Sequence, residues 1–238
     1  MSVLKGEGSV PILFGTRSVT AGAVTHETYL ARPDLSGEWP TVVIVPSGWG
    51  LTSSIKDVAR RLAGHGIAAI VVDVYRGAPP SRAAEPSEVR EALVRATAAG
   101  ASRAVADVIG YVGNSAGFWS NAEDGLAVLG VGDGGSLAID ASLAADSALV
   151  LVASMLSADR ATALTAPFLG IVGRDDEVVS DDDIAAARAA APHGEWVIYD
   201  GVGQDFLDDH RDGFDLNAYE DAVERIAAFC EKHLPIAG

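Results

Sequence analysis

The sequence contains a single cysteine, Cys230, among its 238 residues. One cysteine excludes an internal disulfide and any metal site built from several cysteines. Cys230 shares the apolar stripe of a C-terminal helical pattern with Tyr219, Val223, Ile226 and His233. We therefore expect it to be a buried structural residue rather than a reactive one.

Basic residues and long apolar runs are also scarce. Lys and Arg number 17 against 33 Asp and Glu, and the formal net charge of −16 repels nucleic acid and anionic membranes. The sequence contains no run of 18 uninterrupted apolar residues, so we expect no transmembrane helix. The N-terminal stretch MSVLKGEGSV lacks the basic and then apolar order of a secretion signal. We expect a cytoplasmic protein with no nucleic-acid or membrane partner.

Short β-branched runs alternate with amphipathic segments along the chain, which favours a mainly parallel sheet covered by helices. The length and the 49% hydrophobic content suit one α/β domain spanning residues 1–238. Strands are expected in TVVIVPSGWG (41–50, ending in a loop), IAAIVVDVY (67–75), GLAVLGV, SALVLVA, PFLGIVG and EWVIYDG. Most of these strands end in Gly- or Asp-rich loops, and ligand sites of such sheets form at those ends.

Three helical segments follow from local signals. Ser53 or Ser54 can cap a helix that carries an apolar face. A proline-rich loop leads into a long Ala-rich helical region that ends near Val112. A third helix begins at Ser180, with Asp183 in capping-box spacing and acidic residues in the first turn.

The segment LGVGDGGSLAID, residues 129–140, has the order of an apolar strand, a tight glycine-rich turn and a helix start. This is the turn on which a large group of enzymes mounts a nucleophile. No Ser or Cys stands at its apex. The nucleophile is therefore lost, moved, or not needed.

The order of motifs resembles the dienelactone hydrolase family of α/β-hydrolases over roughly residues 20–235. The resemblance is carried by VVIVPSGWGL, GIAAIVVDVYRG, GVGDGG, VGRDDEVV, YDGVGQDF and the terminal AYEDAVERIAAFCEKHL. It implies an α/β-hydrolase fold with a mainly parallel sheet of about seven or eight strands, helices on both sides, and no separate cap domain.

The family resemblance implies a catalytic triad of Cys or Ser, His and Asp. Matched residue by residue, the acid falls on Asp175, the nucleophile position on Gly132 and the histidine position on Gln204. An acidic residue that many members carry in the first loop is Ser47 here. Of the arginines that some members use for a substrate carboxylate, only Arg76 is a possible counterpart.

The resemblance also implies an oxyanion hole made by two backbone N–H groups, those of Gly48 and Asp133. Such donors survive the loss of a side chain. Small residues that permit a tight strand-to-helix crossing are kept at Gly130, Gly134 and Gly135, and Gly132 would relieve the strain that a nucleophile bears at the apex.

Several residues have more than one interpretation. Asp133 is a helix N-terminal acid, a pocket acid, or a nucleophile of the kind found at the apex of haloalkane dehalogenases. Ser47 is a loop serine or a displaced nucleophile. His210 is a solvated surface histidine or a replacement base that swings into the pocket. His26, His65, His193 and His233 receive no chemical role.

Aromatic side chains at Trp49, Tyr75 and Phe206 would line the pocket mouth or pack in the core, with equal support for each. The acidic run from Asp175 to Glu177 lacks the loop spacing of a calcium site, so we expect solvated acids and no metal. No cofactor is expected.

Three functions remain open for the sequence. The first is a divergent, non-hydrolytic enzyme that binds a small carbonyl or lactone-like ligand and uses Asp175, Asp133 or His210 for proton transfer, as in an isomerisation or cyclisation. The second is a hydrolase with a relocated nucleophile, Asp133 or Ser47. The third is a catalytically silent binding or docking protein. We favour the first, as a monomer or homodimer.

Overall fold

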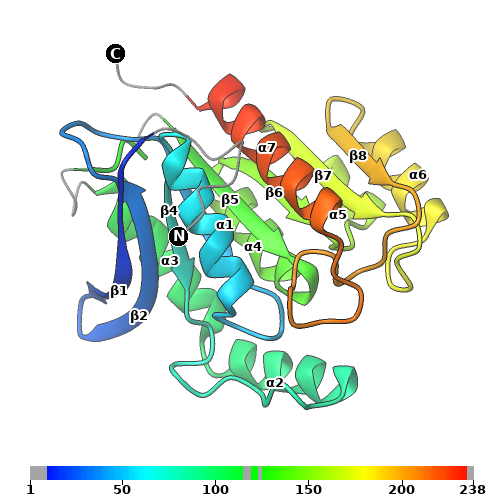
Figure 1. Cartoon of the computed structure of the whole chain (residues 1–238), viewed down its shortest axis with the longest axis horizontal. Helices are drawn as coiled ribbons and strands as arrows, with labels where there is room; N and C mark the ends of the chain where they lie inside the picture. The colour runs from blue at the N-terminus through cyan, green and yellow to red at the C-terminus, as the bar shows by residue number, and fades with distance from the viewer. Residues whose placement is uncertain (1–9, 115–118, 123–124, 235–238) are drawn as a thin grey trace.

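The computed structural model describes residues 10–114, 119–122 and 125–234, so the expectation for the first residues of the chain lies mostly outside the described part. These residues form an eight-stranded sheet of order β1-β2-β4-β3-β5-β6-β7-β8 (Figure 1). The strands are β1 (Ile12–Ala21), β2 (Val24–Pro33), β3 (Thr41–Val45), β4 (Ala68–Val72), β5 (Leu126–Val131), β6 (Ala148–Val152), β7 (Phe168–Gly173) and β8 (Glu195–Tyr199).

Strands β3 to β8 pair in parallel, whereas β1 and β2 form an antiparallel hairpin that joins the sheet at β4. The six parallel strands are those expected from the sequence. The hairpin was not located there, because most side chains of β1 are exposed or half-buried and give little apolar alternation. The strand count and the α/β-hydrolase fold expected from the sequence are confirmed.

Helices cover both faces of the sheet (Figure 1). Helices α1 (Ser53–Gly64) and α7 (Leu216–His233) share one buried apolar cluster with the sheet. A second cluster on the other face includes residues of α3 (Ala101–Gly113), α4 (Gly135–Ala145), α5 (Ala158–Thr162) and α6 (Asp181–Ala190). Helix α2 (Pro86–Ala98) contacts the turn that follows β5. This contact makes α2 one wall of the candidate site described below.

Two local expectations for the helices need correction. Thr52, and not Ser53 or Ser54, caps α1, because its hydroxyl accepts the N–H of Ile55 at 3.2 Å. The Ala-rich region is two helices, separated at Gly100, whose φ of 107° is a left-handed conformation that interrupts the helix.

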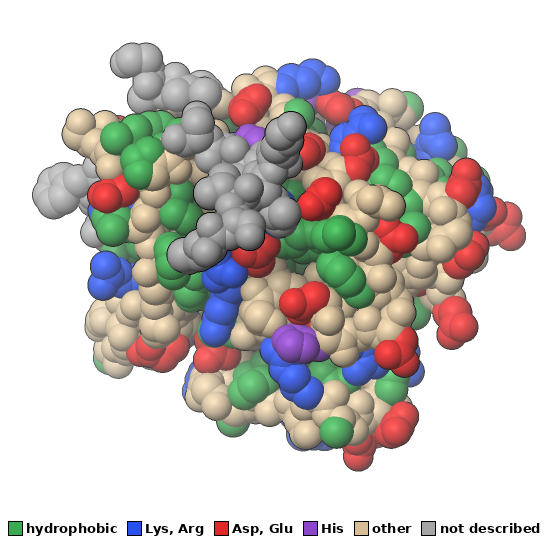
Figure 2. All heavy atoms as spheres, in the orientation of Figure 1, with side chains coloured by type: hydrophobic (Ala, Val, Ile, Leu, Met, Phe, Trp, Pro, Cys, Tyr) green, Lys and Arg blue, Asp and Glu red, His purple; other side chains and the backbone are tan. Residues whose placement is uncertain are grey.

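Other local expectations are confirmed. The capping box of Ser180 and Asp183 opens α6. Cys230 is fully buried on α7, and burial raises the pKa of its thiol to about 12, as suits a structural residue. No helix in the described part of the chain is long and apolar enough to span a membrane. Figure 2 shows acidic side chains spread over the visible face with basic ones between them, rather than gathered in one patch.

Candidate active site

The turn between β5 and α4 has the tight backbone that its glycines predict. Gly132 has a φ of 51°, in the left-handed region, and begins a single 3-10 turn, Gly132–Gly134. A Cβ on Gly134 would lie 2.1 Å from the carbonyl oxygen of Pro46, which only glycine can avoid. The turn is therefore pressed against the loop that follows β3.

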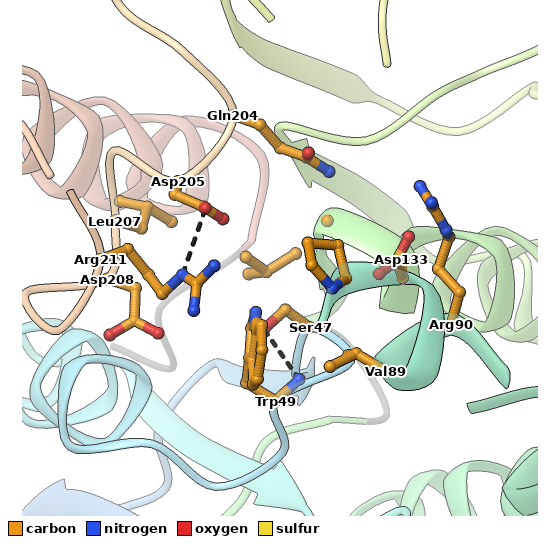
Figure 3. A pocket seen from close by; sticks show the side chains of 13 residues that line it. Ser47, Trp49, Val89, Arg90, Asp133, Gln204, Asp205, Leu207, Asp208 and Arg211 are labelled. Carbon is orange, nitrogen blue, oxygen red and sulfur yellow. Dashed lines mark hydrogen bonds and ion pairs between the residues drawn. The ribbon is translucent and has the colours of Figure 1, made fainter. Parts of the chain in front are cut away.

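A pocket of about 80 Å³ opens beside this turn, with room for several water molecules or a small ligand group (Figure 3). Its apolar lining is Trp49, Pro86, Val89, Val131 and Leu207, and its polar lining is Ser47, Arg90, Asp133, Gln204, Asp205, Asp208 and Arg211, with Gly132 at the turn. The ends of β3 and β5 and the loop after β8 thus converge on one pocket. The sequence predicts such a convergence for the strand ends before Ser47, Gly132, Asp175 and Gln204, and of these four residues Asp175 does not line the pocket.

Asp133 lies half-buried in this pocket and points toward the side of Arg90 (Figure 3). Burial raises the pKa of its carboxyl, and so does the charge of Asp205, while the charge of Arg90 lowers it. No donor among the described residues lies within hydrogen-bond distance of the Asp133 carboxylate oxygens. A raised pKa makes this carboxyl a better proton donor to a ligand than an ordinary aspartate.

The backbone beside Asp133 also carries free donors. A Cβ built on Gly48 would lie 3.2 Å from Oδ2 of Asp133, so the two residues are direct neighbours. Within the described part of the chain, neither the N–H of Gly48 nor that of Asp133 donates to a protein acceptor. Tyr75 supports this loop, because its hydroxyl donates to the carbonyl oxygen of Gly48 at 2.7 Å.

Asp175, the acid expected from the sequence, does not line the pocket, and neither does its neighbour Asp176. Asp175 is exposed and does not line the pocket, whereas the Asp176 side chain is buried, with 7% of its surface exposed. Oδ1 of Asp176 accepts the N–H groups of Val178 at 2.7 Å and Val179 at 3.1 Å. Its Oδ2 is buried without a partner among the described residues. The expectation that this run consists only of solvated acids is therefore wrong for Asp176.

Three other expected pocket residues lie elsewhere. Phe206 is fully buried and packs edge-on against Tyr199, with ring centroids 5.7 Å apart, so it belongs to the core. Tyr75 sits behind the Gly48 loop rather than at the pocket mouth, and burial raises its pKa to about 12. Arg76 donates to the carbonyl oxygen of Ala99 on the surface and does not line the pocket.

The histidines lie outside the pocket. His210 does not reach it; its Nε2 lies 2.9 Å from Oγ of Ser53, and the side chain is about half exposed. The interpretation of His210 as a replacement base is therefore wrong for this conformation. His26 is buried, with its Nε2 2.8 Å from Oδ2 of Asp107. None of the five histidines lines the pocket beside Gly132.

Four charged residues of the pocket lining, Arg90, Asp205, Asp208 and Arg211, were not singled out from the sequence. Asp205 and Arg211 belong to the loop after β8, and Arg90 to α2. Arg211 stacks on Trp49 with its guanidinium carbon 4.4 Å from the ring centroid, and its Nε donates to Oδ2 of Asp205 at 3.4 Å. The only sequence signal for any of these residues is that Asp205 directly follows Gln204, which could have indicated that Asp205 lies near the pocket. No group of three or more possible metal ligands occurs in the described part of the chain.

Comparison with known proteins agrees with the motifs. The family model described as "Dienelactone hydrolase family" matches residues 26–234. A "Putative carboxymethylenebutenolidase" of Salmonella typhimurium is 28% identical over 235 residues, covering 89% of this chain and 84% of that protein. A "Probable 2-oxo-3-(5-oxofuran-2-ylidene)propanoate lactonase" of Bradyrhizobium is 26% identical, covering 87% and 89%.

Solved structures show the same fold. A crystal structure of a "Putative Dienelactone Hydrolase" from Klebsiella pneumoniae superposes with a TM-score of 0.80 at 24% identity, covering 92% of this chain and 98% of that one. The dienelactone hydrolase-like promiscuous phosphotriesterase P91 from metagenomic libraries gives 0.76 at 21% identity, covering 94% and 99%.

Proposed function

Because this chain belongs to the dienelactone hydrolase family, we propose that it is a non-hydrolytic member that binds a small carbonyl or lactone-like compound and moves a proton on it. One observation carries the proposal. Gly132 and Gln204, which the motif resemblance matches to the family's nucleophile and histidine, both line a pocket that contains the half-buried carboxyl of Asp133.

Hydrolysis through an acyl-enzyme needs a nucleophile next to a base. Ser47 is the hydroxyl residue of the pocket lining, and its Oγ accepts the N–H of Trp49 at 3.4 Å. With Gln204 at the histidine position, no imidazole of the pocket lining can take the hydroxyl proton. A serine without a base stays protonated and is a weak nucleophile.

Proton transfer needs no nucleophile, only donors for a carbonyl oxygen and a group that exchanges a proton. The free N–H groups of Gly48 and Asp133 would bind a carbonyl oxygen and stabilise the enolate that forms when a neighbouring carbon loses a proton. One such donor is typically worth about 3–4 kcal/mol of barrier. The Asp133 carboxyl, with its raised pKa, would supply a proton to the enolate.

The test uses α-angelica lactone, a small enol lactone, in D₂O with detection by ¹H NMR. Isomerisation gives the conjugated β-angelica lactone, whereas hydrolysis gives levulinate, so one spectrum separates the two reactions. We expect β-angelica lactone above the no-protein rate, and a loss of at least about 100-fold in Asp133→Asn. Asp212→Asn is the matched control, because Asp212 is exposed and outside the pocket. Levulinate as the product, or no product, would refute the proposal.

Hydrolysis by a relocated nucleophile, Ser47 or Asp133, is the second candidate. It is favoured by the 3.4 Å between Cβ of Ser47 and a Cβ built on Gly132, which puts the Ser47 side chain beside the vacated position, and by the names of the relatives. A fluorophosphonate reagent separates the candidates. We expect an unchanged intact mass; stoichiometric labelling that disappears in Ser47→Ala would make Ser47 the nucleophile.

A further inference from the structure

Each vacated position of the site is followed directly by an aspartate that lines the pocket. Asp133 follows Gly132, and Asp205 follows Gln204. Figure 3 shows the two carboxyls on different sides of the pocket, Asp133 near Arg90 and Asp205 near Arg211. A ligand that occupies the pocket would therefore lie between two carboxyl groups.

Asp205 is held in place by its own loop. Its Oδ2 accepts a hydrogen bond from the Nε–H of Arg211, and the Arg211 guanidinium is stacked on Trp49. Its carbonyl oxygen accepts the N–H of Asp208 at 3.0 Å, and a Cβ built on Gly213 would lie 3.4 Å from Cβ of Asp205. These contacts fix the backbone and leave one carboxylate oxygen without a partner among the described residues. The Asp205 side chain is thus held at the pocket wall by Arg211, with its second carboxylate oxygen available to a ligand.

The neighbouring carboxyls are in a different environment. In the described part of the chain no cation lies within ion-pair distance of Asp133, and the charge of Asp205 adds to burial in raising its pKa. Asp176 is buried with Oδ2 unpartnered, and burial together with the charges of Asp205 and Glu177 raises its pKa. Asp205 is therefore close enough to affect both groups. Two carboxyls whose environments differ in this way can divide the roles of acid and base between them.

Other charged groups that face the pocket have different roles. Asp208 is occupied, because Oδ1 accepts the N–H of His210 at 3.1 Å and the hydroxyl of Ser54 at 3.2 Å. Arg90 faces Asp133 and lowers its pKa without forming an ion pair within 4 Å. Neither residue can serve as a base for a ligand as readily as Asp205 can.

We propose that Asp205 is a second catalytic residue of this pocket, the general base that works with Asp133 as the general acid on an enol lactone. The proposal rests on the proposed function. Asp205 takes a proton from the α-carbon, and the electron pair moves through the ring to the carbonyl oxygen, giving a dienolate. The Asp133 carboxyl then donates its proton to the γ-carbon, and the electrons of the dienolate form the new carbon–hydrogen bond. One carbon–hydrogen bond breaks and one forms, and solvent returns both carboxyls to their starting states.

The experiment follows two signals of α-angelica lactone in D₂O: deuterium exchange at the α-carbon and formation of β-angelica lactone. We expect Asp205→Asn to lose both by at least about 100-fold. Asp133→Asn should keep exchange at the α-carbon, because the base is intact, and lose β-angelica lactone. Asp212→Asn, which makes the same charge change in the same loop, should keep both signals. Circular dichroism and Tm confirm that each variant is folded.

The outcomes separate the two proposals. If Asp205→Asn forms β-angelica lactone as fast as Asp212→Asn does, Asp205 is not the base and the proposed function stands. If the wild type yields only levulinate or no product, the proposed function fails and the acid–base pair with it.

A carboxyl ¹³C NMR titration gives a measurement that does not depend on turnover. The pKa of Asp133, assigned by loss of its signal in Asp133→Asn, should fall in Asp205→Asn because a neighbouring negative charge has been removed. An unchanged Asp133 pKa would overturn the pairing.

Discussion

Restoring a nucleophile and a histidine should convert this site into an ester hydrolase. The change is Gly132→Cys with Gln204→His. Both positions line one pocket, and the buried Oδ2 of Asp176 lacks a partner among the described residues. Residue 204 belongs to the loop that packs against the Asp176 loop, since a Cβ on Gly173 would lie 2.1 Å from the carbonyl oxygen of Val202. We expect the new imidazole to donate to Asp176 and to accept the thiol proton.

The two substitutions should have opposite effects on stability. A Cβ on Gly132 would make an ordinary van der Waals contact with Cβ of Ser47 at 3.4 Å, but the φ of 51° is unfavourable for any L residue with a Cβ. That strain costs about 1–3 kcal/mol, and a chain of this size loses roughly 2–4 °C in Tm per kcal/mol. A histidine at position 204 that donates a hydrogen bond to the buried Oδ2 of Asp176 should offset part of this loss of stability. An unpaired buried acceptor costs about 1–3 kcal/mol.

The rates should be strongly non-additive. A thiol without a base is mostly protonated at neutral pH, and a base without a thiol has no nucleophile to activate. We expect the double variant to hydrolyse p-nitrophenyl acetate at least about 100-fold faster than either single variant. Adding Asp176→Asn should remove most of the gain, while the matched Asp175→Asn should not, because Asp175 is exposed.

Several results would contradict this reasoning. A folded double variant no faster than the single variants would show that residues 132 and 204 do not face each other across the pocket. Equal effects of Asp175→Asn and Asp176→Asn would refute the assignment of the acid. A wild type as fast as the double variant would show that the native site already has a nucleophile.

Two further predictions concern stability. Because the folded-state pKa of Asp176 is raised, the folded protein binds more protons than the unfolded chain above the ordinary aspartate pKa of 3.8, and Asp176 lowers stability as pH rises from there. The stability of Asp176→Asn relative to wild type should therefore rise as the pH increases from about 4 in urea titrations; a constant difference would contradict the raised pKa. Gly134→Ala should cost about 1–3 kcal/mol or more, because its Cβ would overlap the carbonyl oxygen of Pro46, whereas Gly113→Ala, with nothing within 4 Å, should be neutral or stabilising. Equal Tm values for these two variants would refute the close contact.

The parallel strands could be predicted from the sequence because buried strands need continuous apolar runs, and β3, β4 and β7 are buried along their whole length. The antiparallel hairpin could not, because its exposed residues carry little periodic signal. The tight turn at Gly132 was also readable, since its backbone is a local property of the glycine-rich segment.

Which side chains line the pocket and which are buried elsewhere was decided by the tertiary structure. Asp175 and Asp176 have the same chemistry and adjacent positions, yet the fold exposes the first and buries the second. The same holds for Phe206, which the fold places in the core, and for Asp205, which it places in the pocket. Residue type and order thus determined the fold, and they led to the hypothesis that positions 132 and 204 have lost the catalytic residues of the family. The direction of each loop side chain depends on long-range packing, and that packing selected the carboxyls that share the pocket.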